Sequence, residues 1–152
     1  MNSTRWLPRF LLLCAGMSLA ACSRGFVAKA PAGFAEIPAR SELRAVSPDG
    51  VTFRVRREAN KPAAELPFWK EALKRRMLDA GYGLIAERDI KAGTTPGYLL
   101  ELTAPMGSED YLYQVAIFVA NRHIVVAESA GEVTRYKTRA EDIAAAIGQM
   151  IL

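Results

Sequence analysis

The segment from residue 111 to residue 119 constrains the fold more than any other part of the chain, because it is apolar on both sides. Side chains alternate between the two faces of an extended strand. The alternation gives one set of Tyr111, Tyr113, Val115, Ile117 and Val119 and a second set of Leu112, Ala116 and Phe118, interrupted by Gln114. A strand that is apolar on both faces is usually central and covered on both sides. We therefore expect a sheet that lies between two layers.

Five other segments are predicted to be strands, at residues 42–47, 51–58, 83–90, 97–103 and 123–129. The first two are separated by Pro-Asp-Gly at residues 48–50, where proline fixes φ and glycine accepts a positive φ, as a tight turn requires. In the second, Val51, Phe53 and Val55 alternate with polar residues, which is typical of a half-buried strand. The later connections are short, so neighbouring strands are expected to be antiparallel.

Two amphipathic helices complete the predicted domain. The first spans residues 67–80, with a proline in its first turn, a glycine just after its end and an apolar stripe of Trp69, Leu73 and Met77. The second follows the sequence Thr-Arg-Ala-Glu at residues 138–141, which fits a capping box. Its buried stripe is expected to consist of Ile143, Ile147, Met150 and Ile151.

The order β-β-α-β-β-β-β-α predicts the α+β class, with a roughly six-stranded antiparallel sheet and two packed helices. Over residues 42–152, this order and length are similar to the PsbP-like fold of the extrinsic photosystem II subunit and of several bacterial envelope lipoproteins. The resemblance implies a binding or accessory protein, since members of that group mostly lack catalytic chemistry. It carries no functional residue across.

The first residues have the three parts of a secretory signal. Two arginines make the start positive, and the uncharged run of 12 residues that follows is too short to cross a membrane, which takes about 20 apolar residues. Its last residues and the cysteine after them, Leu19-Ala20-Ala21-Cys22, resemble the lipobox of bacterial lipoproteins. The alternative is an ordinary signal peptide, cut by the general signal peptidase, with Cys22 present by chance.

The lipobox resemblance implies cleavage between Ala21 and Cys22, a diacylglyceryl thioether on Cys22, and a further acyl chain such as palmitate on its new amino group. More than one acyl chain anchors a protein stably in a bilayer. Ser23, in place of an aspartate, favours the outer membrane in a Gram-negative host. The implied domains are a signal peptide at residues 1–21, a lipidated N-terminus and tether at 22–41, and one periplasm-facing α+β domain at 42–152.

Charge and cysteine content argue against two other classes of protein. The full chain has 20 Lys+Arg and 16 Asp+Glu, and loss of the two signal arginines leaves 18 basic side chains against 16 acidic ones, a net charge of +2. Basic and acidic residues are interleaved, so no nucleic-acid partner is expected. Loss of Cys14 with the signal and lipidation of Cys22 leave no free thiol, so the domain is expected to have no disulfide.

The sequence offers little catalytic chemistry. His123 is the only histidine, and the scattered acidic pairs do not make a set of metal ligands. No motif for an activated nucleophile, a phosphate or a dinucleotide is present. We therefore expect a protein that is not an enzyme, with no catalytic, cofactor-binding or metal-binding residues.

A partner-binding surface is the more promising feature. Tyr and Arg are enriched at binding hot spots, and Tyr98 and Arg122 are predicted to contribute to such a surface; the alternative places the tyrosines in the core. The basic residues 74–76, with the arginines at 54, 56 and 57, could contact anionic lipid. The favoured interpretation is that they are solvated flanks of a helix and a strand.

Three functions are compatible with these features. The preferred one is a non-enzymatic outer-membrane lipoprotein that binds a protein or another component of the cell envelope. The second is a periplasmic carrier or sensor of a small apolar ligand, held between the sheet and one helix. The third is a hydrolase that uses His123. A deep apolar pocket would favour the carrier. A flat surface rich in Tyr and Arg would favour a protein partner. A serine and a carboxylate beside His123 would favour the hydrolase.

Overall fold

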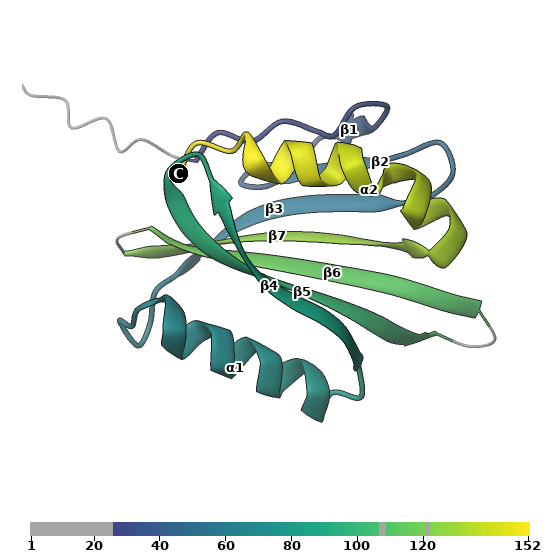
Figure 1. Ribbon diagram of the computed structural model, residues 1–152. Helices are drawn as coiled ribbons and strands as arrows, with labels where there is room; N and C mark the ends of the chain where they lie inside the picture. Colours follow the sequence, from purple (N-terminus) through teal and green to yellow (C-terminus); the bar gives the residue numbers. More distant parts are fainter. Residues whose placement is uncertain (1–25, 107–108, 121) are drawn as a thin grey trace, which may run out of the picture.

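The computed structural model describes residues 26–106, 109–120 and 122–152 (Figure 1). The predicted signal peptide and Cys22 lie outside the described residues. The described residues form one seven-stranded sheet in which neighbouring strands are antiparallel. Its strands, in order across the sheet, are β1 (Ala35–Ile37), β2 (Leu43–Val46), β3 (Thr52–Ala59), β7 (His123–Glu132), β6 (Glu109–Ala120), β5 (Thr95–Met106) and β4 (Gly83–Ala92).

The sheet is covered on both faces, as the doubly apolar segment predicts (Figure 1). Helix α1 (Leu66–Asp79) lies on one face. Helix α2 (Val133–Gly148) and residues 26–34 lie on the other. Strand β6 runs between β5 and β7, and its central residues 114–118 are buried. The α+β class and the position of this strand are confirmed.

The sheet has seven strands, one more than the six predicted. Strand β1 pairs with β2 at the sheet edge, with Ala35 opposite Val46. All three β1 side chains are exposed, so backbone pairing alone fixes this strand and no alternation of apolar residues reveals it. Nearby, Phe26 and Phe34 pack against the core of the α2 face. That residues 22–41 serve as a lipidated N-terminus and tether stays a prediction.

The start of the second helix also differs from the prediction. Helix α2 begins at Val133, and the carboxylate of Glu132 accepts hydrogen bonds from the backbone N–H groups of Thr134 at 2.8 Å and Arg135 at 3.1 Å. Glutamate is not among the preferred N-cap residues, which is why the sequence did not indicate this start. Thr138 lies inside the helix, where its hydroxyl donates to the carbonyl of Arg135 at 2.7 Å.

The two faces hold two separate cores. The α2-side core includes Phe53, Phe118, Ile143, Ile147 and Met150. The α1-side core consists of Tyr98, Leu100, Leu102, Val115, Ile117, Ile124 and Val126, with partly buried side chains of α1 packed against it. No residue of α1 is fully buried. Helix α1 is therefore the more loosely packed of the two layers.

This difference leads to a stability prediction for the two helices. Ile147 in α2 is 4% exposed, so Ile147→Ala is expected to cost about 2–5 kcal/mol of the free energy of unfolding, the usual range for truncating a buried isoleucine. Leu73 in α1 is only half-buried, so Leu73→Ala is expected to cost clearly less. Urea unfolding of both variants measures the difference. Equal losses would contradict the looser packing of α1.

Candidate functional site

A groove of about 650 Å³ lies between α1 and the sheet. Its floor is made by Val115 and Ile117 of β6 and by Ile124 and Val126 of β7. Helix α1 supplies one wall with Trp69, Ala72, Leu73, Arg76 and Met77, and Arg56, Glu58, Ala59, Tyr113 and Glu128 complete the lining. Helix α1 packs mainly on β5 and β6, which leaves the groove between the helix and the β3–β7 part of the sheet. Its volume lies within the ~300–1,000 Å³ typical of ligand sites.

The position of Trp69 on the groove wall is fixed by a hydrogen bond. The indole Nε1 donates to Oδ1 of Asn60 at 2.8 Å, and Asn60 is itself held by hydrogen bonds to the backbone of Ala64 at 2.9 and 3.1 Å. The ring of Phe68 meets the Trp69 ring edge to face, with the centroids 5.2 Å apart. The groove wall is thus pre-formed around a large aromatic side chain.

A polar network lines the β3–β7 side of the groove. The Glu128 carboxylate accepts hydrogen bonds from Nε of Arg56 at 3.1 Å and from the hydroxyl of Tyr113 at 2.6 Å, and Arg56 also donates to Glu58. Burial would raise the pKa of Glu128, but the bonds from Arg56 and Tyr113 outweigh it and hold that pKa below its ordinary value. Burial and the nearby carboxylate together raise the pKa of Tyr113. The network therefore keeps an ionised, fully partnered carboxylate beside an apolar floor.

The lowered pKa of Glu128 predicts an effect of pH on stability. A carboxyl whose pKa is lower in the folded than in the unfolded chain stabilises the fold at pH values above its ordinary pKa of 4.5. This contribution to stability is lost as the pH falls through the pKa of the folded state. Glu128→Gln is expected to cost about 1.5–3 kcal/mol at neutral pH, the worth of hydrogen bonds to a charged group. It should also flatten the loss of stability on acidification.

Urea unfolding between neutral and acidic pH measures both effects. The exposed Glu36, which forms no ion pair among the described residues, supplies the matched control Glu36→Gln. If both variants lose the same unfolding free energy between neutral and acidic pH, Glu128 is not the source of the pH dependence.

The two residues predicted to form a partner surface differ in burial. Tyr98 is 3% exposed and belongs to the α1-side core. Its hydroxyl donates to Glu87, and the Lys70 ammonium lies 4.8 Å from its ring centroid. Its burial argues against an exposed binding role. Arg122 is exposed at the turn between β6 and β7, where its carbonyl accepts from the N–H of Asn60 at 2.9 Å.

Other sequence candidates have structural environments of their own. In the described part of the chain, His123 forms no hydrogen bond or ion pair with a serine or a carboxylate, and no group of three or more metal-ligating side chains is present. Several predicted basic side chains form ion pairs: Arg54 with Glu42, Arg56 with Glu128, Lys74 with Glu87 and Arg75 with Asp79. Among the described helices, none is both long and apolar enough to span a bilayer.

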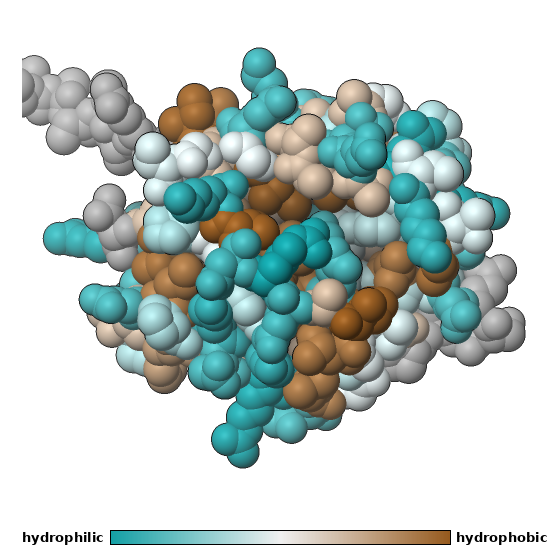
Figure 2. Space-filling model, in the orientation of Figure 1, coloured by the Kyte–Doolittle hydropathy of each residue, from teal (hydrophilic) through white to brown (hydrophobic). Residues whose placement is uncertain are grey.

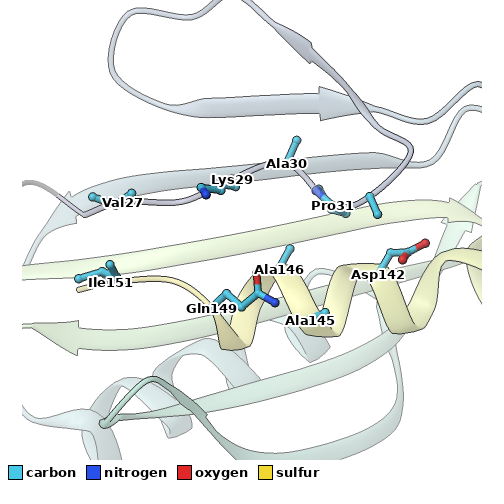
Figure 3. Close-up of a pocket in the computed structure, with 10 residues that line it drawn as sticks. Val27, Lys29, Ala30, Pro31, Asp142, Ala145, Ala146, Gln149 and Ile151 are labelled. Atoms are coloured by element: carbon cyan, nitrogen blue, oxygen red, sulfur yellow. The ribbon is translucent and has the colours of Figure 1, made fainter.

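A second, smaller pocket of about 260 Å³ lies between the N-terminal segment and α2 (Figure 3). Figure 3 shows Val27 and Ile151 at one end of it, with Asp142 and Gln149 contributed by α2 and the residues after it. Its volume falls below the usual range of ligand sites. The groove under α1 is thus the better candidate for binding a ligand.

No known family model matches the sequence, and no curated protein does. Solved structures with a similar fold include PA94 of Pseudomonas aeruginosa, a protein of unknown function, with a TM-score of 0.63 and 12% identity over 78% of this chain and 81% of that one. LpqN of Mycobacterium tuberculosis, which is involved in cell envelope biogenesis, has a TM-score of 0.58 and 11% identity over 82% and 81% of the two chains.

A third similar structure bears on the predicted fold. The cyanobacterial PsbP protein of Synechocystis, CyanoP, matches with a TM-score of 0.58 and 11% identity over 84% of this chain and 86% of that one. The similarity to the PsbP-like fold is therefore confirmed. At this level of identity the three likenesses concern the fold alone.

Proposed function

We propose that this chain is a non-enzymatic binding protein of the cell envelope, anchored in the outer membrane through acylated Cys22 and facing the periplasm. Its binding site is the groove between α1 and the sheet, and its ligand is a small apolar molecule. The observation that carries this proposal is the groove itself, with a floor of four β-branched side chains and a pre-formed wall around Trp69.

The burial of the groove floor favours a small ligand over a protein partner. The floor residues Val115, Ile117, Ile124 and Val126 are 1%, 4%, 6% and 8% exposed. Hot spots for protein partners are enriched in accessible Tyr, Trp and Arg side chains, and Tyr98, the tyrosine predicted for such a surface, is buried. A small apolar ligand reaches a recessed floor that a broad protein surface does not.

The polar side chains of the groove favour binding over catalysis. Glu128 already accepts hydrogen bonds from both Arg56 and Tyr113, and its lowered pKa keeps it unprotonated near neutral pH. A general acid or base needs a pKa close to the working pH. The involvement of LpqN, which shares the fold, in cell envelope biogenesis supports a role in the same compartment.

The groove can be tested through its own tryptophan. Trp6 is lost with the predicted signal peptide, which leaves Trp69 as the only tryptophan of the mature chain. N-phenyl-1-naphthylamine, a neutral apolar fluorophore, should accept energy from Trp69 and saturate a single site. With about 17 heavy atoms at ~0.4 kcal/mol each, its expected dissociation constant is on the order of 10 µM. A titration that shows no energy transfer from Trp69 would refute the proposal.

A further inference from the structure

Five segments distant in sequence converge at one end of the sheet. The end of β3 lies beside the start of β7, since Ala59 is opposite His123, and the β6–β7 turn follows. The start of β5 lies beside the end of β6 through the pair Gly97 and Phe118, which brings in the β4–β5 turn. The N–H of Gly93 in that turn donates to the carbonyl of Gly148 at 3.1 Å, which adds the C-terminus.

The beginning of the described chain lies at the same end. Val27 and Ile151 form an antiparallel bridge, with N–H···O distances of 2.8 and 3.0 Å. Their side chains are 51% and 68% exposed. The prediction that Ile151 belongs to the buried stripe of the second helix is therefore wrong, because α2 ends at Gly148 and Ile151 lies beyond it. Figure 1 shows the C-terminus beside the point where the described chain begins, and Figure 2 shows apolar residues on the surface next to it. Two large apolar side chains thus point into solvent together.

Exposed basic side chains occur on segments at the same end of the sheet. Lys29, Lys61, Lys91 and Arg122 come from four of the converging segments, and all four are exposed. Within the described residues none of the four forms an ion pair. Glu65, at the start of α1, is an exposed acid of the same end. The balance of charge at this end is therefore positive.

The opposite end of the sheet has a different arrangement. There Arg139 pairs with Asp49 of the β2–β3 turn at 3.3 Å, and Arg135 lies 4.0 Å from Glu132. These two basic side chains are paired with acids of the protein, whereas Lys137 of α2 is exposed and forms no ion pair among the described residues. Exposed apolar side chains also occur at that end, at Leu84 and Ile85 at the start of β4. The end where the described chain begins differs in having four exposed basic side chains without ion pairs, on segments that converge with the exposed pair Val27 and Ile151.

We infer that this end, defined by Val27, Lys29, Lys61, Lys91, Arg122 and Ile151, rests directly on a bilayer of anionic phospholipids. The inference depends on the proposed acylation of Cys22. Five peptide units separate Cys22 from Val27, which is at most about 18 Å of extended chain. The anchor therefore holds this end close to the lipid surface. Each basic side chain near an anionic bilayer raises the equilibrium constant for contact by about fivefold. The two apolar side chains enter the headgroup region.

The test uses the full lipoprotein, purified from membranes and reconstituted in vesicles of phosphatidylcholine with or without phosphatidylglycerol. Because the mature chain has no free thiol when Cys22 is acylated, Ile151→Cys introduces a single site for an environment-sensitive fluorophore. Lys137→Cys, an exposed position on α2, is the matched control. Phosphatidylglycerol is expected to increase quenching by spin-labelled lipid about threefold or more at residue 151, and not at residue 137.

Charge reversal distinguishes contact made by these basic side chains from closeness to the bilayer that the lipid anchor alone would cause. The triple change Lys29→Glu, Lys61→Glu and Lys91→Glu should reduce quenching at residue 151 to the level at residue 137. The control triple Arg75→Glu, Arg135→Glu and Lys137→Glu alters the net charge equally at exposed positions away from this end, and it should leave the quenching at residue 151 unchanged. Equal quenching at both labels, or equal effects of both triples, would overturn the inference. A chain whose mass shows no acyl group and that does not float with the vesicles would instead refute the anchor.

Discussion

Replacement of Phe118 by alanine is expected to lower the free energy of unfolding by about 3–5 kcal/mol, the usual cost of truncating a buried phenylalanine. Phe118 is 0% exposed and lies in the α2-side core. A Cβ on Gly97, opposite it on β5, would lie 2.3 Å from its ring, so the ring packs directly on the glycine backbone. The cavity left by alanine cannot be filled by that glycine. We expect the melting temperature to fall by about 10–20 °C.

The control for this prediction is Phe68→Ala on helix α1. Phe68 is 50% exposed, and its loss removes one edge-to-face contact with Trp69. Its expected cost is about 0.5–1.5 kcal/mol. Thermal unfolding of both variants by circular dichroism gives the comparison. Similar melting temperatures would show that the central strand is not packed as described.

Replacement of Cys22 by serine is expected to remove membrane anchoring altogether. A serine hydroxyl cannot form the thioether on which lipid attachment depends, and the domain alone has no membrane-spanning helix among its described residues. The variant should be found in the soluble periplasmic fraction or remain unprocessed, and its mass should lack the acyl chains. Detergent partitioning and mass spectrometry of the chain measure both.

Cys14→Ser supplies the matched control, because this cysteine lies within the predicted signal peptide. It should leave both partitioning and mature mass unchanged. A Cys22→Ser protein that still partitions into detergent with an unaltered mature mass would contradict the lipobox interpretation and favour an ordinary signal peptide.

The elements that were predicted correctly are those with a strong side-chain pattern. The apolar residues on both sides of β6 indicated its central position, and the stripe of Trp69, Leu73 and Met77 indicated that α1 covers a sheet. Residues that are buried at a regular spacing give a periodic apolar pattern in the sequence. Strand β1 has no such pattern, because its side chains are exposed and it is held by backbone pairing with β2.

The candidate site was only partly predictable. A ligand between sheet and helix was one of the alternatives, but the groove depends on how far α1 extends across the sheet, which no local pattern specifies. The burial of Tyr98 had a readable signal, since it shares one strand face with Leu100 and Leu102. The network of Arg56, Tyr113 and Glu128 joins three strands, so it becomes visible only once the strand order is known.

The binding of N-phenyl-1-naphthylamine to two alanine-to-phenylalanine variants tests the proposed ligand site most directly. Ala72 lines the groove on α1, and Ala72→Phe should fill it and weaken binding by at least about tenfold, or ~1.4 kcal/mol. Ala144→Phe makes the same change at an exposed position of α2 and should leave the dissociation constant unchanged. Equal affinities of both variants and the wild-type protein would contradict a ligand site between α1 and the sheet.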